Sequence, residues 1–403
     1  MRILILSQVF YPDTVSVSQH LTDLSIKLVE DGHDVKVYTS CFPYEEKTNR
    51  YNKREEFKGI KIDRLLQTSF GKSNVLFRLI DFTTFYLTIS FKLLFVKRRE
   101  FDVIVGTTVP PLLSFVGVVI SKLKGIKFQY WVMDLQPELS ISSGLIRKNS
   151  PSAMVFTKIG NYIIQNSAGI ISLDRFMTDY LLARGAKKEV ISTIPVWPVL
   201  DERYVGTRKQ NPFRLENSFG EKIVIMYSGN HAFVHHLDTL LGAALKLKKD
   251  PKFLFVFVGG GVRKKDVSNF KTKHQLENIV QLPFQPRENI HNSLGSADIQ
   301  VVILGDGQVG YTHPNKVYGA MYIGKPILYI GPKESHVIDI LGKLDGNISV
   351  SHGESELLAQ QITLLFSKSW DEIEMIGDAN MKYAVENFHP DVLKKKMLDA
   401  VLR

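Results

Sequence analysis

The sequence is poor in cysteine: among its 403 residues, Cys41 is the only one. A single cysteine excludes a disulfide within the chain and a metal site built on a cysteine cluster. Because disulfides mark oxidising compartments, we expect the protein to work in a reducing one. Glycine and proline, with 28 and 16 residues, are present at ordinary levels, which excludes fibrous and low-complexity architectures.

Long apolar runs and the common nucleotide motifs are also absent. The most apolar stretch, residues 74–99, is interrupted by Arg78, Asp81 and Lys92, whereas a membrane-spanning helix needs about 20 predominantly apolar residues. The first residues, MRILILSQVFYP, lack a cleavage site, so we interpret them as a buried strand and not as a signal peptide. The glycine-rich turns match neither GxGxxG nor a P-loop. No nucleophile and base for hydrolysis stand out.

Positive charge is concentrated in the first half of the chain. Residues 1–200 contain 26 Lys and Arg against 18 Asp and Glu, a net +8, and the remainder contains 25 against 23, a net +2. This asymmetry indicates an anionic partner. Without a nucleic-acid motif it favours membrane lipid over nucleic acid, and scattered solvated lysines are the alternative. Residues 74–99 fit an interfacial helix closed by Lys97, Arg98 and Arg99, or a helix that covers the first sheet with a snorkelling basic end.

Strand and helix patterns alternate along both halves of the chain. This alternation predicts an α/β protein with two Rossmann-like, doubly wound domains that face each other. We place the first domain at residues 1–200, the second at 201–385, and a polar linker at 198–220. The last residues read as two helical segments that are broken near His389 and Pro390.

In parallel sheets, ligands bind at the carboxyl ends of the strands, so polar residues there are candidate site residues. In the first domain, Ser16 and Ser18 stand at a helix start, where they could receive a sugar hydroxyl or an anion. Asp134 and Glu138 lie in the segment DLQPE after a strand. A carboxylate at such a position can act as an acid, a base or a hydroxyl anchor. For each of the four residues, a helix N-cap is the alternative.

Three strand ends of the second domain combine glycine with basic or imidazole side chains. Glycine lets the backbone approach a phosphate closely, and basic side chains neutralise it. The histidines lack a carboxylate that would complete a metal set, so the pattern favours a diphosphate over a metal ion. A solvated basic turn is the alternative for the segment GGGVRKKD. The candidates are Gly229, Asn230, His231, His236, Gly260, Arg263, Asn315 and Lys316.

The order and spacing of these segments resemble the GT-B glycosyltransferases of family 4. The branch is the one that builds bacterial surface polysaccharides, such as exopolysaccharide, O-antigen and colanic acid. The resemblance covers nearly the whole chain. It is carried by FYPDTVSVSQHLTDLSIKLVEDGHDVKVYT, VMDLQPE, IPVWP, YSGNHAFVHHLDTLL, FVGGG, LPFQPRENIHNSLGSADIQVV and HPNKVYGAMYIGKPILYIGP.

The resemblance implies a retaining sugar transfer that needs neither metal nor cofactor. The donor would be a nucleotide-diphosphate sugar, a UDP-sugar more than a GDP-sugar, bound by the second domain. The acceptor would be a glycan or a polyprenyl-diphosphate-linked sugar at the inner face of the cytoplasmic membrane. The resemblance also implies that a C-terminal helix, residues 386–403, packs back on the first domain. Within its segments, Pro283, Phe284 and His313 join the donor-site candidates.

The chain departs from the family pattern at several positions. Two glutamates of the family motif, one facing the donor sugar and one holding the ribose, are replaced by Tyr311 and Gly319. We therefore expect Glu334 and Ser335, at the next strand end, to hold the ribose hydroxyls, with a helix N-cap as the alternative.

Further departures affect the charged residues. A family arginine and lysine align with Asn230 and His236, and a strand-end histidine aligns with Asp134. These departures leave open a catalytically silent partner subunit. A UDP-sugar 2-epimerase shares the architecture and is a further alternative.

Overall fold

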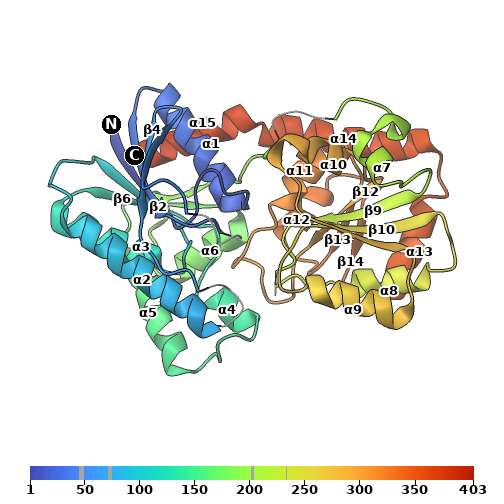
Figure 1. The fold of residues 1–403 in the computed structure, drawn as a ribbon, viewed down its shortest axis with the longest axis horizontal. Helices are drawn as coiled ribbons and strands as arrows, with labels where there is room; N and C mark the ends of the chain where they lie inside the picture. The colour runs from blue at the N-terminus through green and yellow to red at the C-terminus, as the bar shows by residue number, and fades with distance from the viewer. Residues whose placement is uncertain (45–49, 71–74, 201–203, 233) are drawn as a thin grey trace. The chain divides into compact units, whose positions relative to one another are not determined.

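The chain folds into two compact units, shown in the computed structural model of Figure 1. The first unit comprises Met1–Val196, Gly310–His313 and Pro390–Arg403, and the second comprises Trp197–Val309 and Pro314–His389. The structure describes residues 1–44, 50–70, 75–200, 204–232 and 234–403.

The first unit is built on an eight-stranded sheet in the order β3-β4-β2-β1-β5-β6-β7-β8. Every neighbouring pair is parallel except β3 and β4, which form an antiparallel hairpin at the edge. The central strands are buried on both faces, which explains their continuous apolar sequences. The strands are β1 (Arg2–Leu6), β2 (Asp34–Ser40), β3 (Arg54–Phe57), β4 (Ile60–Leu65), β5 (Val103–Gly106), β6 (Lys127–Trp131), β7 (Gly169–Ser172) and β8 (Ile191–Thr193).

Helices cover both faces of the first sheet (Figure 1). Helices α2, α3 and α5 lie together on one face, and α1 packs with α15 on the other. The position of α15 confirms that the end of the chain returns to the first unit. The helices are α1 (Ser16–Glu30), α2 (Val75–Leu94), α3 (Leu113–Lys124), α4 (Glu138–Ser142), α5 (Pro151–Asn166), α6 (Arg175–Ala183) and α15 (Pro390–Leu402), with a 3-10 turn at Lys188–Val190.

Helix α2 uses one face to cover the sheet. Phe85, Ile89 and Leu93 recur every four residues and are fully buried. The structure therefore shows a helix that covers the sheet, but the helix ends at Leu94, so Lys97, Arg98 and Arg99 follow it and do not form its end; residue 74 lies outside the described residues. No helix in the described ranges is long and apolar enough to cross a membrane.

The second unit contains a six-stranded parallel sheet in the order β11-β10-β9-β12-β13-β14. Its interior strand β10 has the sequence FLFVFV, and all six residues are buried. Together the two sheets confirm the predicted α/β class with two doubly wound domains. The strands are β9 (Ile223–Ser228), β10 (Phe253–Val258), β11 (Ile279–Leu282), β12 (Ile299–Ile303), β13 (Ile327–Ile330) and β14 (Ile348–Val350).

The helices of the second unit also form two layers (Figure 1). Helices α8, α9 and α13 lie on one face, while α10, α11 and α14 lie on the other. The helices are α7 (Pro212–Glu216), α8 (Asp238–Lys246), α9 (Lys264–His274), α10 (Ile290–Gly295), α11 (Lys316–Tyr322), α12 (His336–Leu341), α13 (Ser355–Leu365) and α14 (Trp370–Phe388), with 3-10 turns at Arg208–Gln210 and Arg287–Asn289.

The predicted linker is shorter than its polar sequence indicated. Phe213 and Phe219 are buried in a core cluster of the second unit, and Arg214 forms a buried ion pair with Asp298. Residues 208–220 are therefore part of the second unit's fold, and residues 201–203 of the expected linker lie outside the described residues. The hairpin of β3 and β4 was not predicted, because REEF alternates around exposed charges and carries no apolar run.

Candidate functional site

Two glycine turns meet at the carboxyl ends of the neighbouring strands β9 and β10. Gly229 follows β9 with φ 124°, and Gly259 follows β10 with φ 128°, a region that side chains other than glycine rarely adopt. A Cβ atom added to Gly259 would lie 2.2 Å from the carbonyl oxygen of Gly229. The backbones of the two turns are in contact, so a side chain at Gly259 would collide with the Gly229 carbonyl. Glycine is therefore required at this position for the two turns to meet.

Lys316, the first residue of α11, extends into this edge. Its Nζ lies 3.6 Å from the centroid of the Tyr227 ring, and its Cε would be 2.7 Å from a Cβ at Gly229. Nζ is buried and has no hydrogen-bond partner among the described residues. Burial lowers the pKa of this amine well below its usual value. An ammonium without an acceptor is costly in such surroundings, so an anion beside it would be strongly stabilised.

Two histidines from the Gly229 turn line the same edge. His231 donates its backbone N–H to the Gly260 carbonyl at 2.6 Å, and its Nδ1 lies 3.1 Å from that oxygen. His235 Nδ1 lies 2.8 Å from the Tyr227 hydroxyl. Burial, reinforced by the charge of Lys316, lowers the pKa of His231 to about 4 and that of His235 to about 3. Both imidazoles are neutral at pH 7, and His231 Nε2 has no partner among the described residues.

Arg263 and His236 are less available than the sequence indicated. The Arg263 guanidinium lies 3.5 Å from the Asp266 carboxylate and 4.0 Å from that of Asp238. His236 packs its ring edge-on against His352, 5.6 Å away between centroids. Burial lowers the pKa of His236, and the charge of Arg263 adds to this effect. Arg263 therefore has acidic neighbours that would compete with a phosphate.

The remaining predicted donor residues surround these turns. Phe284 packs on Gly260, where an added Cβ would be 2.9 Å from its ring, and Pro283 next to it is exposed. Asn315 precedes Lys316 as the N-cap residue of α11, without a side-chain capping bond. Helix α11 has only seven residues, so the charge of Lys316, and not a helix dipole, is what this edge offers an anion.

At the end of β13, the structure separates Ser335 from Glu334. Ser335 is fully buried, caps α12 by accepting from the Ile338 N–H, and accepts from the Tyr329 hydroxyl at 2.9 Å. Its hydroxyl is thus used internally, which is the N-cap alternative. Glu334 is exposed and remains a candidate for holding ribose hydroxyls.

In the first unit, Asp134 follows β6 at the carboxyl edge of the sheet. Its Oδ1 accepts from the Thr312 hydroxyl at 2.6 Å, and its backbone N–H donates to Thr108 Oγ1 at 3.2 Å. Burial raises the pKa of the carboxyl, while the Thr312 bond and the charge of His313 oppose that rise. Asp134 is not a helix cap, because α4 starts at Glu138 behind Pro137.

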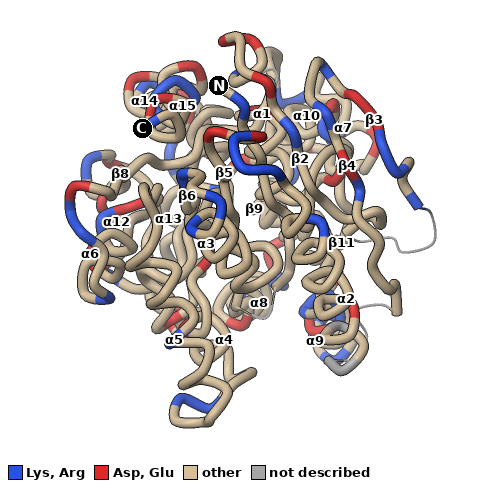
Figure 2. Tube along the Cα trace, turned by 90° about the vertical axis from the view of Figure 1, so that its left-hand side faces the viewer, with Lys and Arg blue, Asp and Glu red and all other residues tan. Residues whose placement is uncertain are grey.

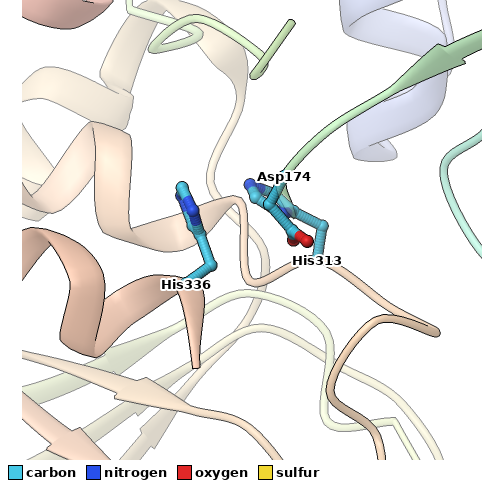
Figure 3. A group of neighbouring side chains, drawn as sticks. All are labelled: Asp174, His313 and His336. Atoms are coloured by element: carbon cyan, nitrogen blue, oxygen red, sulfur yellow. The ribbon is translucent and has the colours of Figure 1, made fainter. Parts of the chain in front are cut away.

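His313 also belongs to the first unit, where its Nδ1 lies 2.6 Å from Asp174 Oδ2 (Figure 3). Asp174 uses its other carboxylate oxygen to cap α6 by accepting from the Met177 N–H. His336, the third side chain in Figure 3, belongs to the second unit and lies 2.7 Å from the Tyr318 hydroxyl through Nε2. The sequence places His313 among the donor-site candidates, whereas in the structure its ring is fully buried and paired with a carboxylate.

Glu138 is occupied by a buried ion pair. It is 8% exposed, and its Oε1 accepts from the Arg184 guanidinium, which also lies over the Tyr180 ring. Removing the Arg184 charge would leave the Glu138 carboxylate buried without its counter-ion. Glu138 therefore holds α4 in place, and its carboxylate is engaged by Arg184 instead of being available for the predicted catalytic role.

The serines at the start of α1 behave differently from each other. Val15 is the N-cap residue, so neither serine is the cap. Ser16 is exposed, with its hydroxyl 3.3 Å from His20 Nδ1, whereas Ser18 is fully buried. Only Ser16 can meet a ligand from solvent at this edge.

Comparison with known proteins finds a family model that matches part of this chain. Residues 209–388 match the family model described as glycosyl transferases group 1. This match covers most of the second unit. The whole chain has the GT-B fold: its match to the crystal structure of HepE from Anabaena covers 100% of this chain and 99% of that one, with a TM-score of 0.73 and 14% identity.

Two curated relatives are also similar in sequence. The probable glycosyltransferase WbjE of Pseudomonas aeruginosa is 24% identical over 61% of this chain, a region that spans 62% of that relative's length. The putative colanic acid biosynthesis glycosyl transferase WcaI of Escherichia coli is 23% identical over 80% of this chain and 82% of the relative.

Tyr311 and Gly319, the two positions at which the resemblance implies glutamates, lie in different units. Tyr311 is in the first unit and packs edge-on against Tyr180, with 5.2 Å between ring centroids. Gly319 is in α11 of the second unit, and an added Cβ would meet only Leu294 Cδ1, at 3.8 Å. The fold therefore leaves room for a side chain at Gly319, and sterics do not explain the glycine.

Sequence reasoning missed Thr312, Asp174 and Tyr227. Each of them acts through a predicted residue: Thr312 through Asp134, Asp174 through His313, and Tyr227 through Lys316. Tyr227 is the penultimate residue of the strand β9, two residues before Gly229, and this position near a strand end is a signal that could have found it. Thr312 stands next to His313, but nothing local to it indicates Asp134.

Proposed function

We propose that the protein is a retaining glycosyltransferase of family 4. It moves a hexosyl or N-acetylhexosaminyl group from a nucleotide-diphosphate sugar to a glycan or a polyprenyl-diphosphate-linked acceptor. The observation that carries this proposal is the enclosed amine of Lys316, which lies without an acceptor against the Gly229 turn of a group 1 glycosyltransferase domain. A diphosphate would supply the negatively charged acceptor that is missing beside this amine.

The donor in this proposal is a UDP-sugar. Support comes from HepE, whose crystal structures hold UDP with glucose and UDP-glucose. No metal is needed in the proposed reaction, because the charge of Lys316 stabilises the leaving diphosphate. His231, which is neutral at pH 7, donates or accepts a hydrogen bond at the same edge. Glu334 holds the ribose in place of the missing glutamate.

Asp134 is the catalytic group that we propose for the first unit. It stands at the carboxyl edge of the sheet, where it can orient or deprotonate an acceptor hydroxyl. Glu138 has no part in this step, because Arg184 occupies its carboxylate. Ser16 is exposed at the same edge and is the candidate contact to the acceptor sugar.

The process is the synthesis of a bacterial surface polysaccharide at the inner face of the cytoplasmic membrane. The names of WbjE and WcaI support a glycosyltransferase, and that of WcaI supports colanic-acid-like polysaccharide. The outer side of α2 supports membrane contact, because Leu87, Phe91, Leu94 and Phe95 are 55–69% exposed. Lys124, at the end of α3, lies beside the end of α2, because its Nζ donates to the Leu94 carbonyl at 3.0 Å, and Figure 2 shows further basic residues in blue along α3 and β6. Apolar and basic side chains together suit an anionic bilayer surface.

Titration with UDP, UDP-glucose and the guanosine counterparts tests the donor site. We expect a uridine diphosphate compound to raise the melting temperature of the full chain, by an amount that increases with the logarithm of its concentration above the Kd. Lys316→Ala should weaken this binding about tenfold or more, because a charge-assisted hydrogen bond contributes roughly 1.5–3 kcal/mol. Lys248→Ala, which removes an exposed lysine from the same unit, is the matched control.

Two outcomes would contradict the donor site: no stabilisation by any nucleotide diphosphate, or unchanged affinity in Lys316→Ala. With an active donor and acceptor pair, nuclear magnetic resonance of the product anomer tests retention. Full activity in the presence of a chelator is expected for a metal-independent transfer.

A further inference from the structure

Residues 310–313 leave the second unit's sequence to join the first unit. The Tyr311 carbonyl accepts from the Leu135 N–H at 2.8 Å, and Thr312 forms an isolated antiparallel β-bridge with Asp134. A Cβ added to Gly310 would lie 3.0 Å from the Phe176 carbonyl oxygen, so this residue also packs closely. The segment is therefore tied by backbone bonds to the loop that carries Asp134.

The Thr312 side chain makes a specific contact in this arrangement. Its hydroxyl donates to Asp134 Oδ1 at 2.6 Å, a short distance of the kind found for charge-assisted bonds. The bridge places both backbones in register, so the hydroxyl reaches the carboxylate without a long, flexible side chain. Thr312 Oγ1 can donate only one hydrogen, and Asp134 receives it.

We propose that Thr312 is a positioning residue for catalysis: its hydroxyl holds the Asp134 carboxylate in one orientation and favours its ionised form. This inference rests on the proposed function, in which Asp134 acts on the acceptor. Two residues after Thr312, Pro314 returns the chain to the second unit, and Lys316 follows. One short segment thus supplies the group that orients Asp134 and leads directly to the lysine of the donor site.

The charged and titratable groups around Asp134 make the effect measurable. His313 acts on Asp134 by its charge and is itself paired with Asp174, while the Tyr130 phenol feels the Asp134 carboxylate from β6. Burial raises the pKa of Asp134, and the Thr312 hydrogen bond is the larger of the two effects that oppose it. Loss of the hydroxyl should therefore raise that pKa further and leave less carboxylate at neutral pH.

Thr312→Val and Thr312→Ser form the decisive pair, because valine keeps the shape and serine keeps the hydroxyl. In Thr312→Val, we expect the acidic limb of kcat/KM against pH to move up by about one pH unit. A hydrogen bond to a charged group stabilises the ionised form by at least the free energy that corresponds to one pKa unit. Thr312→Ser should retain the wild-type profile. UDP binding, measured by melting temperature, should be unchanged in both variants.

A second measurement needs no substrate. Asp134 has a raised folded pKa, so its contribution to stability is present at low pH and is lost as pH rises through that pKa. Because Thr312 matters mainly to the ionised carboxylate, Thr312→Val should lose more stability relative to wild type at pH 7 than at pH 4. Thr312→Ala serves as a second variant if Thr312→Val does not fold.

An unchanged acidic limb, or an equal loss of stability at both pH values, would overturn the role of Thr312 alone. Full activity of Asp134→Asn would instead refute the role proposed for Asp134, and with it the need to position that group. Failure of every nucleotide to bind concerns the donor site and is a third, separate result.

Discussion

At the scale of single residues, two helical glycines have opposite surroundings. Gly319 in α11 has open space on its side-chain side, whereas a Cβ at Gly377 in α14 would lie 2.2 Å from the Gly324 carbonyl oxygen. We expect Gly319→Ala to raise the free energy of unfolding by about 0.5–1 kcal/mol, because alanine favours helix. Gly377→Ala should lower it by about 1–3 kcal/mol through overpacking.

Urea denaturation of the full chain measures both glycine variants against the wild type. A destabilised Gly319→Ala would show that the site next to Leu294 is tighter than the structure indicates. The first variant also bears on the position at which the resemblance implies a glutamate: a stable Gly319→Ala would mean that the fold does not require glycine at residue 319.

Lys316 should make stability depend on pH. Its folded pKa is lowered by burial, so between that pKa and about 10.4 the unfolded chain binds more protons than the folded one. Stability then rises with pH across this window. In Lys316→Met the amine is replaced by an apolar side chain of similar length, and the pH dependence due to this residue disappears.

We therefore expect Lys316→Met to be more stable than the wild type near pH 7, with the difference shrinking toward about pH 9.5. Urea midpoints at the two pH values measure it. His231 and His235 face Lys316 and have lowered folded pKa values, but their titration in the unfolded chain is common to wild type and variant, so it cancels in the difference. A difference that stays constant with pH would mean that Lys316 is not strained by burial.

At the scale of elements, α2 has two sides that serve different purposes. Phe85, Ile89 and Leu93 bind it to the sheet, while Phe91 and Leu94 point outward and are exposed. The segment that follows carries three consecutive basic residues, which are Lys97, Arg98 and Arg99. Apolar contact alone binds a bilayer weakly, so the basic residues should decide the affinity for an anionic surface.

Flotation with vesicles that contain phosphatidylglycerol tests α2. Changing Lys97, Arg98 and Arg99 together to glutamine should lower the bound fraction about a hundredfold, at roughly 1 kcal/mol for each charge. The control changes three exposed lysines of the second unit, Lys248, Lys249 and Lys273, and removes the same charge. Equal loss in both triple variants would indicate net charge and not a site on α2, and no binding by the wild type would refute membrane contact.

At the scale of the whole molecule, the proposed function assigns a different part of the chemistry to each unit. The second unit contains Lys316 and the glycine turns, and the first contains Asp134 with Thr312. Because the two sets belong to different units, their effects on kinetics should separate.

Asp134→Asn should therefore lower kcat about a hundredfold or more, as expected for loss of a general base, while the Kd for UDP stays unchanged. Steady-state kinetics together with calorimetric titration of UDP separate the two effects. Retained kcat would remove Asp134 from the mechanism, and a weakened UDP affinity would mean that the first unit contributes to donor binding.

Much of the fold could be predicted, because the signals that define it are local. The apolar strands of both sheets are short, continuous runs such as FLFVFV, and such runs indicate parallel strands buried on both faces. The hairpin of β3 and β4 was missed because its edge strand is polar, and α7 was missed because only two aromatic residues mark it as part of a core.

The sequence by itself determined the two α/β units, the glycine turns and the presence of Lys316 at a strand edge, since each of these depends on neighbouring residues. Only the tertiary structure decided which polar groups are already occupied. Glu138 is paired with Arg184, 46 residues away, His313 with Asp174, 139 residues away, and Asp134 with Thr312, 178 residues away. A buried polar group must be satisfied by whatever the fold brings beside it, and that partner is not local in sequence.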